Sequence, residues 1–144
     1  MSSVCSNRSS ASGGTAIIFS RILNCVDISH NFHNFEHLEF SVVSFVRFSK
    51  SFCFAVVYLP QRSNKEITEF RLFVDQLKDF EFDFTIIVGD FNANHTSWGG
   101  EFNNSRGNQL YNNIIESFVS PVVLPKCTRV GNRCQRDSTI DLIF

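Results

Sequence analysis

The sequence has 144 residues, of which 43% are hydrophobic and 17 are phenylalanine, so its composition is that of one globular domain and not of a disordered chain. Its formal net charge of −1 provides no overall basic excess of the kind that marks many nucleic-acid-binding proteins. No apolar run reaches the roughly 20 residues that a membrane span needs, and the five cysteines include no Cys-x-x-Cys pair, which argues against a disulfide framework. We therefore expect an intracellular protein, nuclear or cytoplasmic, with no membrane partner.

The first half of the chain predicts a tail followed by strands. Residues 1–12 are polar and rich in serine, and we expect them to form a flexible tail before a domain at residues 13–144. Apolar and alternating runs predict strands over residues 15–19, 38–48 and 51–59. Pro60 ends the last of these, because proline cannot continue a central ladder.

The second half predicts two helices and three more strands. Ser63 and Glu66 have the spacing of a capping box. Apolar residues then recur at three- and four-residue steps, which predicts an amphipathic helix with a core-facing stripe of Ile67, Phe70, Val74, Leu77 and Phe80. The apolar run at residues 84–88 predicts a buried strand, and a helix before such a strand indicates an α/β layer arrangement. A second helix is expected over residues 108–117, and strands over residues 122–124 and 139–144.

Asp90 and Asn92 follow the strand at residues 84–88 and are the main candidates for chemistry. In layered α/β folds, ligands bind beyond the carboxyl ends of strands. A carboxylate for a hard cation and an amide for a phosphate oxygen suit a phosphodiester substrate. Gly89 would permit a tight turn and the close approach of a ligand. On these residues alone, a loop that opens with turn-forming Asp and Asn is the more frequent explanation of the pattern.

Four segments, in the same order and spacing, resemble the endonuclease/exonuclease/phosphatase superfamily. Within it, they are most similar to the endonuclease of jockey-type non-LTR retrotransposons. The segments are GGTAI at 13–17, VYLP at 57–60, GDFNANHTSWG at 89–99 with NSRG at 104–107, and STIDLIF at 138–144. The resemblance implies a four-layered α/β sandwich, with two packed mixed sheets flanked by helices. We expect a partial form of it, lacking the N- and C-terminal parts of the domain.

The resemblance also implies an activity, a cofactor and roles for particular residues. The activity is Mg²⁺-dependent nicking of DNA by phosphodiester hydrolysis, with Mn²⁺ as the alternative metal. Asp90 would bind metal or activate water, Asn92 would hold the scissile phosphate, Tyr58 would contact that phosphate, and Asp141 would bind metal or orient a histidine. DNA is the implied partner, together with the reverse transcriptase part of the same polyprotein.

Two family features have no counterpart in these 144 residues: a metal-binding glutamate before the Gly-Gly-x-Ala-Ile segment, and a histidine in a Ser-Asp-His motif after the Ser-x-x-Asp segment. We therefore expect a fragment with impaired activity, as in a truncated reading frame or gene prediction, or one whose missing strands come from a partner chain. The alternative function is a non-catalytic remnant of the scaffold that binds nucleic acid or protein.

Four residues are candidates for substrate binding, each with a structural alternative. His95 would contact DNA or brace its loop, and Trp98 would stack on a base or cover the core. Arg129 and Arg133 belong to a basic stretch that would contact DNA phosphates or form a solvated loop.

Overall fold

The computed structural model describes residues 1–6, 14–61, 63, 65–115, 117–123, 128–129 and 138–144. The strands are β1 (Ser2–Ser6), β2 (Thr15–Phe19), β3 (Val26–Asp27), β4 (Glu39–Arg47), β5 (Lys50–Tyr58), β6 (Phe84–Asp90) and β7 (Asp141–Ile143). The helices are α1 (Lys65–Lys78) and α2 (Ser105–Ile114), with short 3-10 turns at Arg21–Leu23, Ser29–Asn31 and Thr96–Trp98.

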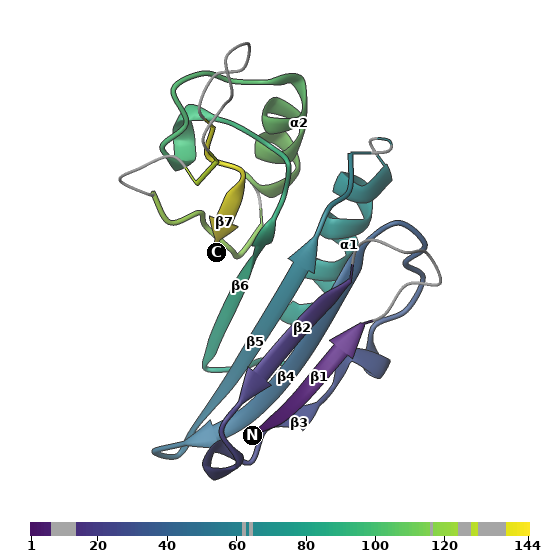
Figure 1. The fold of residues 1–144 in the computed structure, drawn as a ribbon, viewed down its shortest axis with the longest axis vertical. Helices are drawn as coiled ribbons and strands as arrows, with labels where there is room; N and C mark the ends of the chain where they lie inside the picture. The colour runs from purple at the N-terminus through teal and green to yellow at the C-terminus, as the bar shows by residue number, and fades with distance from the viewer. Residues whose placement is uncertain (7–13, 62, 64, 116, 124–127, 130–137) are drawn as a thin grey trace.

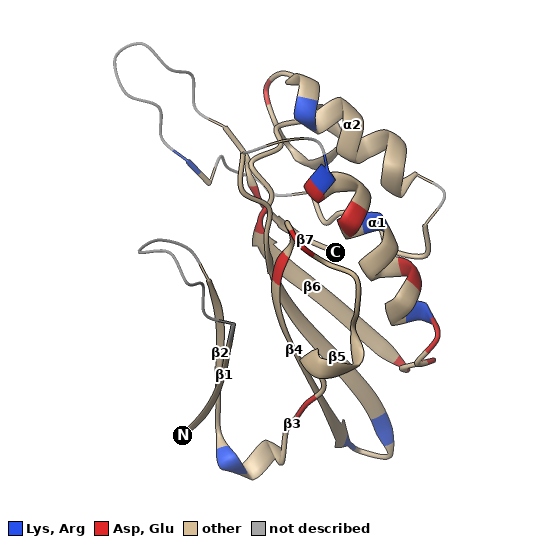
Figure 2. Ribbon diagram, turned by 90° about the vertical axis from the view of Figure 1, so that its right-hand side faces the viewer, with Lys and Arg blue, Asp and Glu red and all other residues tan. Residues whose placement is uncertain are grey.

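A mixed five-stranded sheet forms the centre of the molecule, in the order β3-β4-β5-β6-β7 (Figure 1). Only β5 and β6 are parallel, and α1 makes the crossover between them. Both helices lie on one face of this sheet, and the antiparallel pair β1-β2 lies on the other (Figure 2). The predicted α/β fold with two packed sheets and flanking helices is therefore confirmed.

The main core lies between the central sheet and the helices. Alternate residues of β5, Cys53, Ala55 and Val57, point into it because side chains alternate between the faces of a strand. The predicted helix stripe supplies the opposite side through four buried residues, Ile67, Phe70, Val74 and Leu77. Phe80, which follows the end of α1, is 39% exposed, so the stripe ends earlier than predicted. None of the described helices is long and apolar enough to cross a bilayer.

The second helix begins three residues before the predicted start. The side chain of Asn104 accepts a hydrogen bond from the Gly107 backbone N–H (2.6 Å) and thereby caps α2. Leu110 and Ile114 are buried as expected, whereas Phe118 lies beyond the helix and is 45% exposed. An asparagine cap is compatible with many loops, so periodicity of the apolar residues alone did not locate this start.

The last two predicted strands are only partly formed. The expected strand at residues 139–144 is confirmed as β7, which is extended by two hydrogen bonds between the backbones of Ile87 and Phe144. Val122 donates its N–H to the carbonyl of Ile143 (2.8 Å), but residues 122 and 123 do not form a strand, and residue 124 lies outside the described residues.

The expectation of a flexible tail does not hold for Ser2–Ser6. This segment pairs with β2 over its whole length, and Val4 is buried against Ile17 and Val43. The polar composition of residues 1–12 gave no indication of a strand. Once β2 provides a partner, a single buried apolar residue, Val4, is enough to fix which face of the strand points inwards. Residues 7–12 lie outside the described residues.

Candidate active site

Three of the predicted catalytic side chains form one row at the carboxyl end of β6. Tyr58 of β5 pairs with Asp90 of β6, and Asp90 pairs with Asp141 of β7. Residues paired in this way project from the same face of a sheet, with Cβ atoms about 5 Å apart. Tyr58 and Asp90 are half-buried and Asp141 is exposed. The catalytic row (Tyr58, Asp90 and Asp141) is therefore held by the central sheet and accessible from solvent.

Gly89 lies inside β6 and not in the tight turn that the sequence predicts. A Cβ atom at this position would lie 1.8 Å from the carbonyl oxygen of Val57 in β5, so no side chain fits there. Glycine is required here because β5 passes close to β6, and not because a ligand approaches. The close packing of these two strands places Asp90 beside Tyr58.

Asn92 forms the turn that follows the row. Its φ of 51° is in the left-handed region, which asparagine tolerates better than most residues. Its backbone N–H donates to Oδ1 of Asp90 (2.9 Å), and its Nδ2 donates to the carbonyl of Leu59 (3.0 Å). Asn92 therefore both forms the turn and lies beside the carboxylate of Asp90, a candidate catalytic residue.

The electrostatics of the row favour a cation. Burial raises the pKa of Asp90 above its ordinary value, and the Asp141 carboxylate raises this pKa further. The hydrogen bond from the Asn92 N–H and the charges of Arg129 and Arg106 act in the opposite direction. A cation between the two carboxylates would relieve their repulsion, and paired oxygen ligands suit a hard divalent ion.

Asp90 and Asp141 therefore fit a divalent metal as two of its ligands. Within the described part of the chain, no group of three or more His, Cys, Asp or Glu side chains is placed to hold a metal ion. The remaining ligands would be water or substrate oxygen, which is a common arrangement for Mg²⁺.

Two of the predicted substrate-binding residues are packed inside the loop after β6. Trp98 is 0% exposed and donates from Nε1 to the carbonyl of Ala93 (3.1 Å), so it covers the core and cannot stack on a base. His95 is 7% exposed, stacks on Tyr111 at 4.6 Å and accepts a hydrogen bond at Nδ1 from the Ser97 N–H (3.1 Å). Burial lowers the pKa of His95. His95 thus has the bracing position, and not a surface position facing DNA.

Asn94 connects this loop to β7, and the sequence did not identify it. Its side chain is fully buried, donates from Nδ2 to the Phe102 carbonyl (2.6 Å) and accepts at Oδ1 from the Thr139 N–H (2.7 Å). Thr139 lies two residues before Asp141, so Asn94 helps to set the place of Asp141 relative to β6. A polar residue in a polar loop carries no sequence signal for burial.

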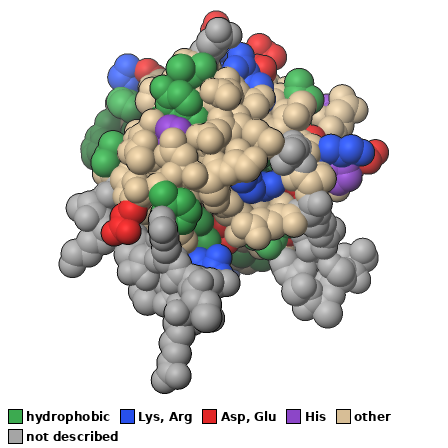
Figure 3. Space-filling model, turned by 90° about the horizontal axis from the view of Figure 1, so that it is seen from above, with side chains coloured by type: hydrophobic (Ala, Val, Ile, Leu, Met, Phe, Trp, Pro, Cys, Tyr) green, Lys and Arg blue, Asp and Glu red, His purple; other side chains and the backbone are tan. Residues whose placement is uncertain are grey.

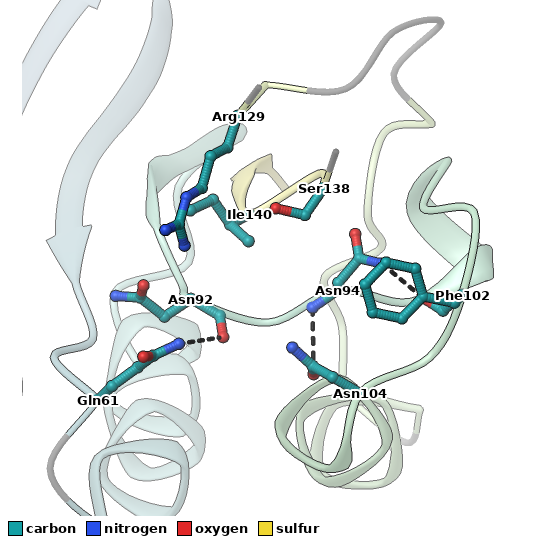
Figure 4. Close-up of a pocket in the computed structure, with 8 residues that line it drawn as sticks. All are labelled: Gln61, Asn92, Asn94, Phe102, Asn104, Arg129, Ser138 and Ile140. Atoms are coloured by element: carbon teal, nitrogen blue, oxygen red, sulfur yellow. Dashed lines mark hydrogen bonds between the residues drawn. The ribbon is translucent and has the colours of Figure 1, made fainter. Parts of the chain in front are cut away.

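Arg129 is the predicted substrate-binding residue that lies at the site, whereas Arg133 is outside the described residues. Backbone hydrogen bonds of 2.9 Å in both directions join Arg129 to Ser138. Its guanidinium group extends towards Asn92 over a pocket of about 270 Å³ (Figure 4). The pocket is lined by Gln61, Asn92, Asn94, Phe102, Asn104, Arg129, Ser138 and Ile140. Among the residues that the structure describes, its wall contains amides and one cation but no carboxylate, which favours an anionic or polar ligand.

Seen from above, this end of the molecule shows Lys and Arg side chains among other side chains and backbone, together with clusters of hydrophobic side chains (Figure 3). Arg106, from the NSRG segment, lies on the inner side of the same region. Its guanidinium group donates to the carbonyls of Phe91 (3.2 Å) and Ser63 (2.8 Å) and lies 3.8 Å from the Glu66 carboxylate. The sequence placed Arg106 in a recognisable segment but assigned it no role.

Comparisons with known proteins concern the family and the fold of the chain. Residues 52–144 match the family described as "Endonuclease-reverse transcriptase". Over 82 residues the chain is 35% identical to a "Probable RNA-directed DNA polymerase from transposon X-element" of Drosophila melanogaster, a match covering 57% of this chain and 9% of that protein. The fold is similar to the "Endonuclease domain of TRAS1, a telomere-specific non-LTR retrotransposon", with a TM-score of 0.64 and 19% identity, covering 99% of this chain and 66% of that one.

Proposed function

The chain belongs to the endonuclease-reverse transcriptase family, and on that premise we propose that it is the nuclease part of a retrotransposon protein, hydrolysing phosphodiester bonds in DNA. Its resemblance to the endonucleases of non-LTR retrotransposons is confirmed by the family match and by the similar fold. The chain spans 9% of the transposon relative and 66% of the TRAS1 domain. Any activity of these longer proteins is therefore only proposed for this chain.

The observation that supports the proposal most strongly is the pairing of Asp90 with Asp141 at the strand ends, beside Tyr58. Two carboxylates and one phenol on one open face provide ligands for a metal and a donor for a phosphate oxygen. Neither carboxylate is needed to complete the core, since Asp90 is half-buried and Asp141 is exposed.

We assign the steps of hydrolysis as follows. Asn92 and Tyr58 hold the non-bridging oxygens of the scissile phosphate through their side-chain N–H and O–H groups. A water oriented by Asp90 would form the new P–O bond and give its proton to the Asp90 carboxylate, while the bond to the leaving sugar oxygen breaks and that oxygen takes a proton from solvent. Arg129 contacts a neighbouring phosphate, and its charge favours the approach of DNA. Arg133 would extend this contact.

The proposed cofactor is Mg²⁺, with Mn²⁺ able to replace it, held by Asp90 and Asp141. When bound, it supplies charge that stabilises the leaving oxygen. We further propose that these 144 residues alone nick DNA slowly, because they contain no match for the family's upstream glutamate or for its Ser-Asp-His histidine. Loss of a general acid–base group typically lowers a rate by about 10²–10⁴-fold.

The reverse transcriptase part of a common polyprotein is the proposed protein partner, and the nucleus or cytoplasm is the proposed location. The match to a transposon protein described as an RNA-directed DNA polymerase supports this association.

Plasmid nicking provides the test. Supercoiled plasmid is incubated with the purified 144-residue chain and Mg²⁺ or EDTA, and the open-circular product is measured. We expect slow nicking that EDTA abolishes and that Asp90→Asn and Asp141→Asn each reduce by about 100-fold or more. Asp75→Asn, on the exposed side of α1, is the matched control and should nick at the wild-type rate.

Each outcome has a definite meaning. Nicking that survives Asp90→Asn would place the activity elsewhere. DNA binding without nicking, and without any effect of Mg²⁺ on the thermal stability of the chain, would favour the non-catalytic remnant. Rapid nicking at rates typical of complete nucleases would contradict the proposed impairment.

A further inference from the structure

Arg106 lies behind the catalytic row and contacts both of the segments that leave it. We propose that Arg106 is a positioning residue: reaching across from α2, it fixes the loop after β5 and the turn after β6, so that Tyr58, Asp90 and Asn92 keep their relative places. The inference rests on the proposed nuclease function for its consequence on rate, but its structural content can be tested separately.

The guanidinium group joins two segments that are far apart in the sequence. On the segment after β6, Nε donates to the carbonyl of Phe91 (3.2 Å). On the segment after β5, Nη1 donates to Ser63 (2.8 Å), while Nη2 donates to Pro60 (3.2 Å) and to Leu59 (3.4 Å). One side chain thus donates hydrogen bonds to four backbone carbonyls, three on one segment and one on the other.

Arg106 and Asn92 meet at a single atom. The carbonyl oxygen of Leu59 accepts hydrogen bonds from Nδ2 of Asn92 (3.0 Å) and from Nη2 of Arg106 (3.4 Å). Phe91, whose carbonyl binds Nε, is the residue between Asp90 and Asn92. A movement of Arg106 would therefore displace the backbone on both sides of Asn92 without any contact between Arg106 and the substrate.

The position of the guanidinium group is itself fixed by Glu66. This carboxylate is 0% exposed, lies 3.8 Å from Nη1, and also accepts the N–H of Ser63 (3.1 Å) at the start of α1. The Arg106 side chain is 11% exposed. A buried ion pair is held in one geometry because separating the charges leaves each of them buried without its counter-charge. Burial lowers the pKa of Arg106, and the Glu66 charge opposes this.

The geometry requires arginine and not merely a positive charge. The planar guanidinium group presents several N–H donors in fixed directions, whereas an ammonium group has three donors at one point. Lysine at position 106 could pair with Glu66 but could not reach both Phe91 and Pro60. Arg106→Lys therefore keeps the buried charge pair and removes the connection between the two segments.

The kinetic test compares Arg106→Lys with Arg71→Lys in the 144-residue chain. Arg71 is a matched control, because it pairs with Asp75 within α1 and joins α1 to the carbonyl of Asn113 in α2 (2.5 Å), but outside the row. We expect Arg106→Lys to lower kcat for plasmid nicking by about 10–100-fold, as a small misplacement of catalytic groups does, with KM for DNA changed less than twofold. Arg71→Lys should leave both values unchanged.

Amide hydrogen exchange tests the positioning without relying on activity. In Arg106→Lys, exchange should accelerate at Leu59, Phe91 and Asn92 and stay unchanged at Ala55 in the middle of β5. Selective acceleration in a chain that does not nick would mean that the proposed function fails while the positioning role stands. Unchanged exchange at these three amides, or an equal increase throughout β5 and β6, would overturn the inference.

A second variant covers the case in which Arg106→Lys does not fold. The double variant Arg106→Met/Glu66→Gln removes both buried charges at similar volume. The same selective exchange and the same loss of kcat are expected from it. Wild-type exchange and wild-type kcat in this variant would overturn the inference.

Discussion

Two aspartates at the opposite ends of β6 have opposite environments. Asp83, directly before the strand, accepts hydrogen bonds from Nζ of Lys50 (2.6 Å) and from the N–H (2.8 Å) and hydroxyl (2.9 Å) of Ser51, and these contacts hold its pKa at about 2. Asp90, at the end of the strand, is partly buried beside Asp141, and its pKa is raised. The residue type is the same, and the surroundings decide its ionisation.

The difference separates a structural carboxylate from a candidate functional one. At the Asp83 end, nearby donors stabilise the charge and join the β4-β5 hairpin to the start of β6. At the Asp90 end, the charge is poorly compensated by the protein, which is typical of a group that receives its partner from a ligand. Four substitutions test whether the two ends differ in this way.

The largest effect on the free energy of unfolding is expected from Gly89→Ala, at the Asp90 end of β6. A methyl group would lie 1.8 Å from the Val57 carbonyl oxygen, so β5 and β6 would have to separate. We expect the free energy of unfolding to fall by about 4 kcal/mol or more, measured by urea denaturation. Thr85→Ala, near the Asp83 end of the same strand, is the control, and we expect it to lower stability by about 1 kcal/mol. Equal losses of stability from Gly89→Ala and Thr85→Ala would show that β5 and β6 can separate at the Asp90 end without added cost.

The next largest effect is expected from Asn94→Ala. It leaves the Phe102 carbonyl and the Thr139 N–H without their buried partner, and each unsatisfied group costs about 1–3 kcal/mol. We expect a loss of about 2–4 kcal/mol by chemical denaturation. Asn103→Ala, which removes an exposed acceptor of the Thr96 N–H, should lower stability by less than about 1 kcal/mol. A loss from Asn94→Ala as small as that from Asn103→Ala would mean that water replaces the buried amide.

In the absence of metal, Asp90→Asn is expected to have a smaller effect and to raise the stability of the chain. A carboxyl whose pKa is raised on folding destabilises the folded state when ionised, and this penalty disappears as the pH falls below the unfolded value of about 3.9. At neutral pH the variant should therefore melt a few degrees above the wild type, and below about pH 4 the difference should vanish. Added Mg²⁺ should raise the melting temperature of the wild type only. A lower melting temperature for Asp90→Asn would show that the carboxylate serves the fold.

The smallest effect is expected from Asp83→Asn. A depressed pKa stabilises the folded state above the unfolded value of about 3.9, and this contribution is lost as the pH falls towards the folded value of about 2. The variant should be slightly less stable than the wild type at pH 7, and the difference should disappear as the pH falls below about 2. Added salt should reduce the difference, because the pair with Lys50 is exposed. Thermal melting across this pH range, with Asp79→Asn as the surface control, measures the effect.

Much of the fold was predictable because it depends on local periodicity. The strand at residues 15–19 has the predicted bounds, and those at 39–47 and 50–58 differ by about one residue. The predicted contact of Ser63 with Glu66 before the helix is present, because the Glu66 carboxylate accepts the Ser63 N–H (3.1 Å) and hydroxyl (3.0 Å), while the Ser63 hydroxyl accepts the N–H of Lys65 and not that of Glu66. The strand at Ser2–Ser6 was missed, because its partner is separated from it in the sequence and its own composition is polar.

The candidate site was predictable where a residue belongs to a motif and not where it acts through contacts. The structure brings Tyr58, Asp90 and Asp141 into one row, whereas Trp98 lies in the core. The exposure of a side chain depends on which other segments cover it. The sequence of the loop after β6 does not show whether Trp98 is covered. Arg106 was overlooked for the same reason, since four of its acceptors are backbone carbonyls, which have no signature in the sequence.

The sequence by itself determined the alternation of strands and helices, the family and the identity of the carboxylate at the end of β6. These depend on side-chain periods of two and 3.6 residues and on short motifs, which neighbouring residues carry. Only the tertiary structure decided that Asp90 faces Asp141, that Asp83 is neutralised by donors on the β4-β5 hairpin, and that Arg106 joins the two segments behind the row. Charge and hydrogen bonding act between atoms that are close in space, and folding alone determines which atoms those are.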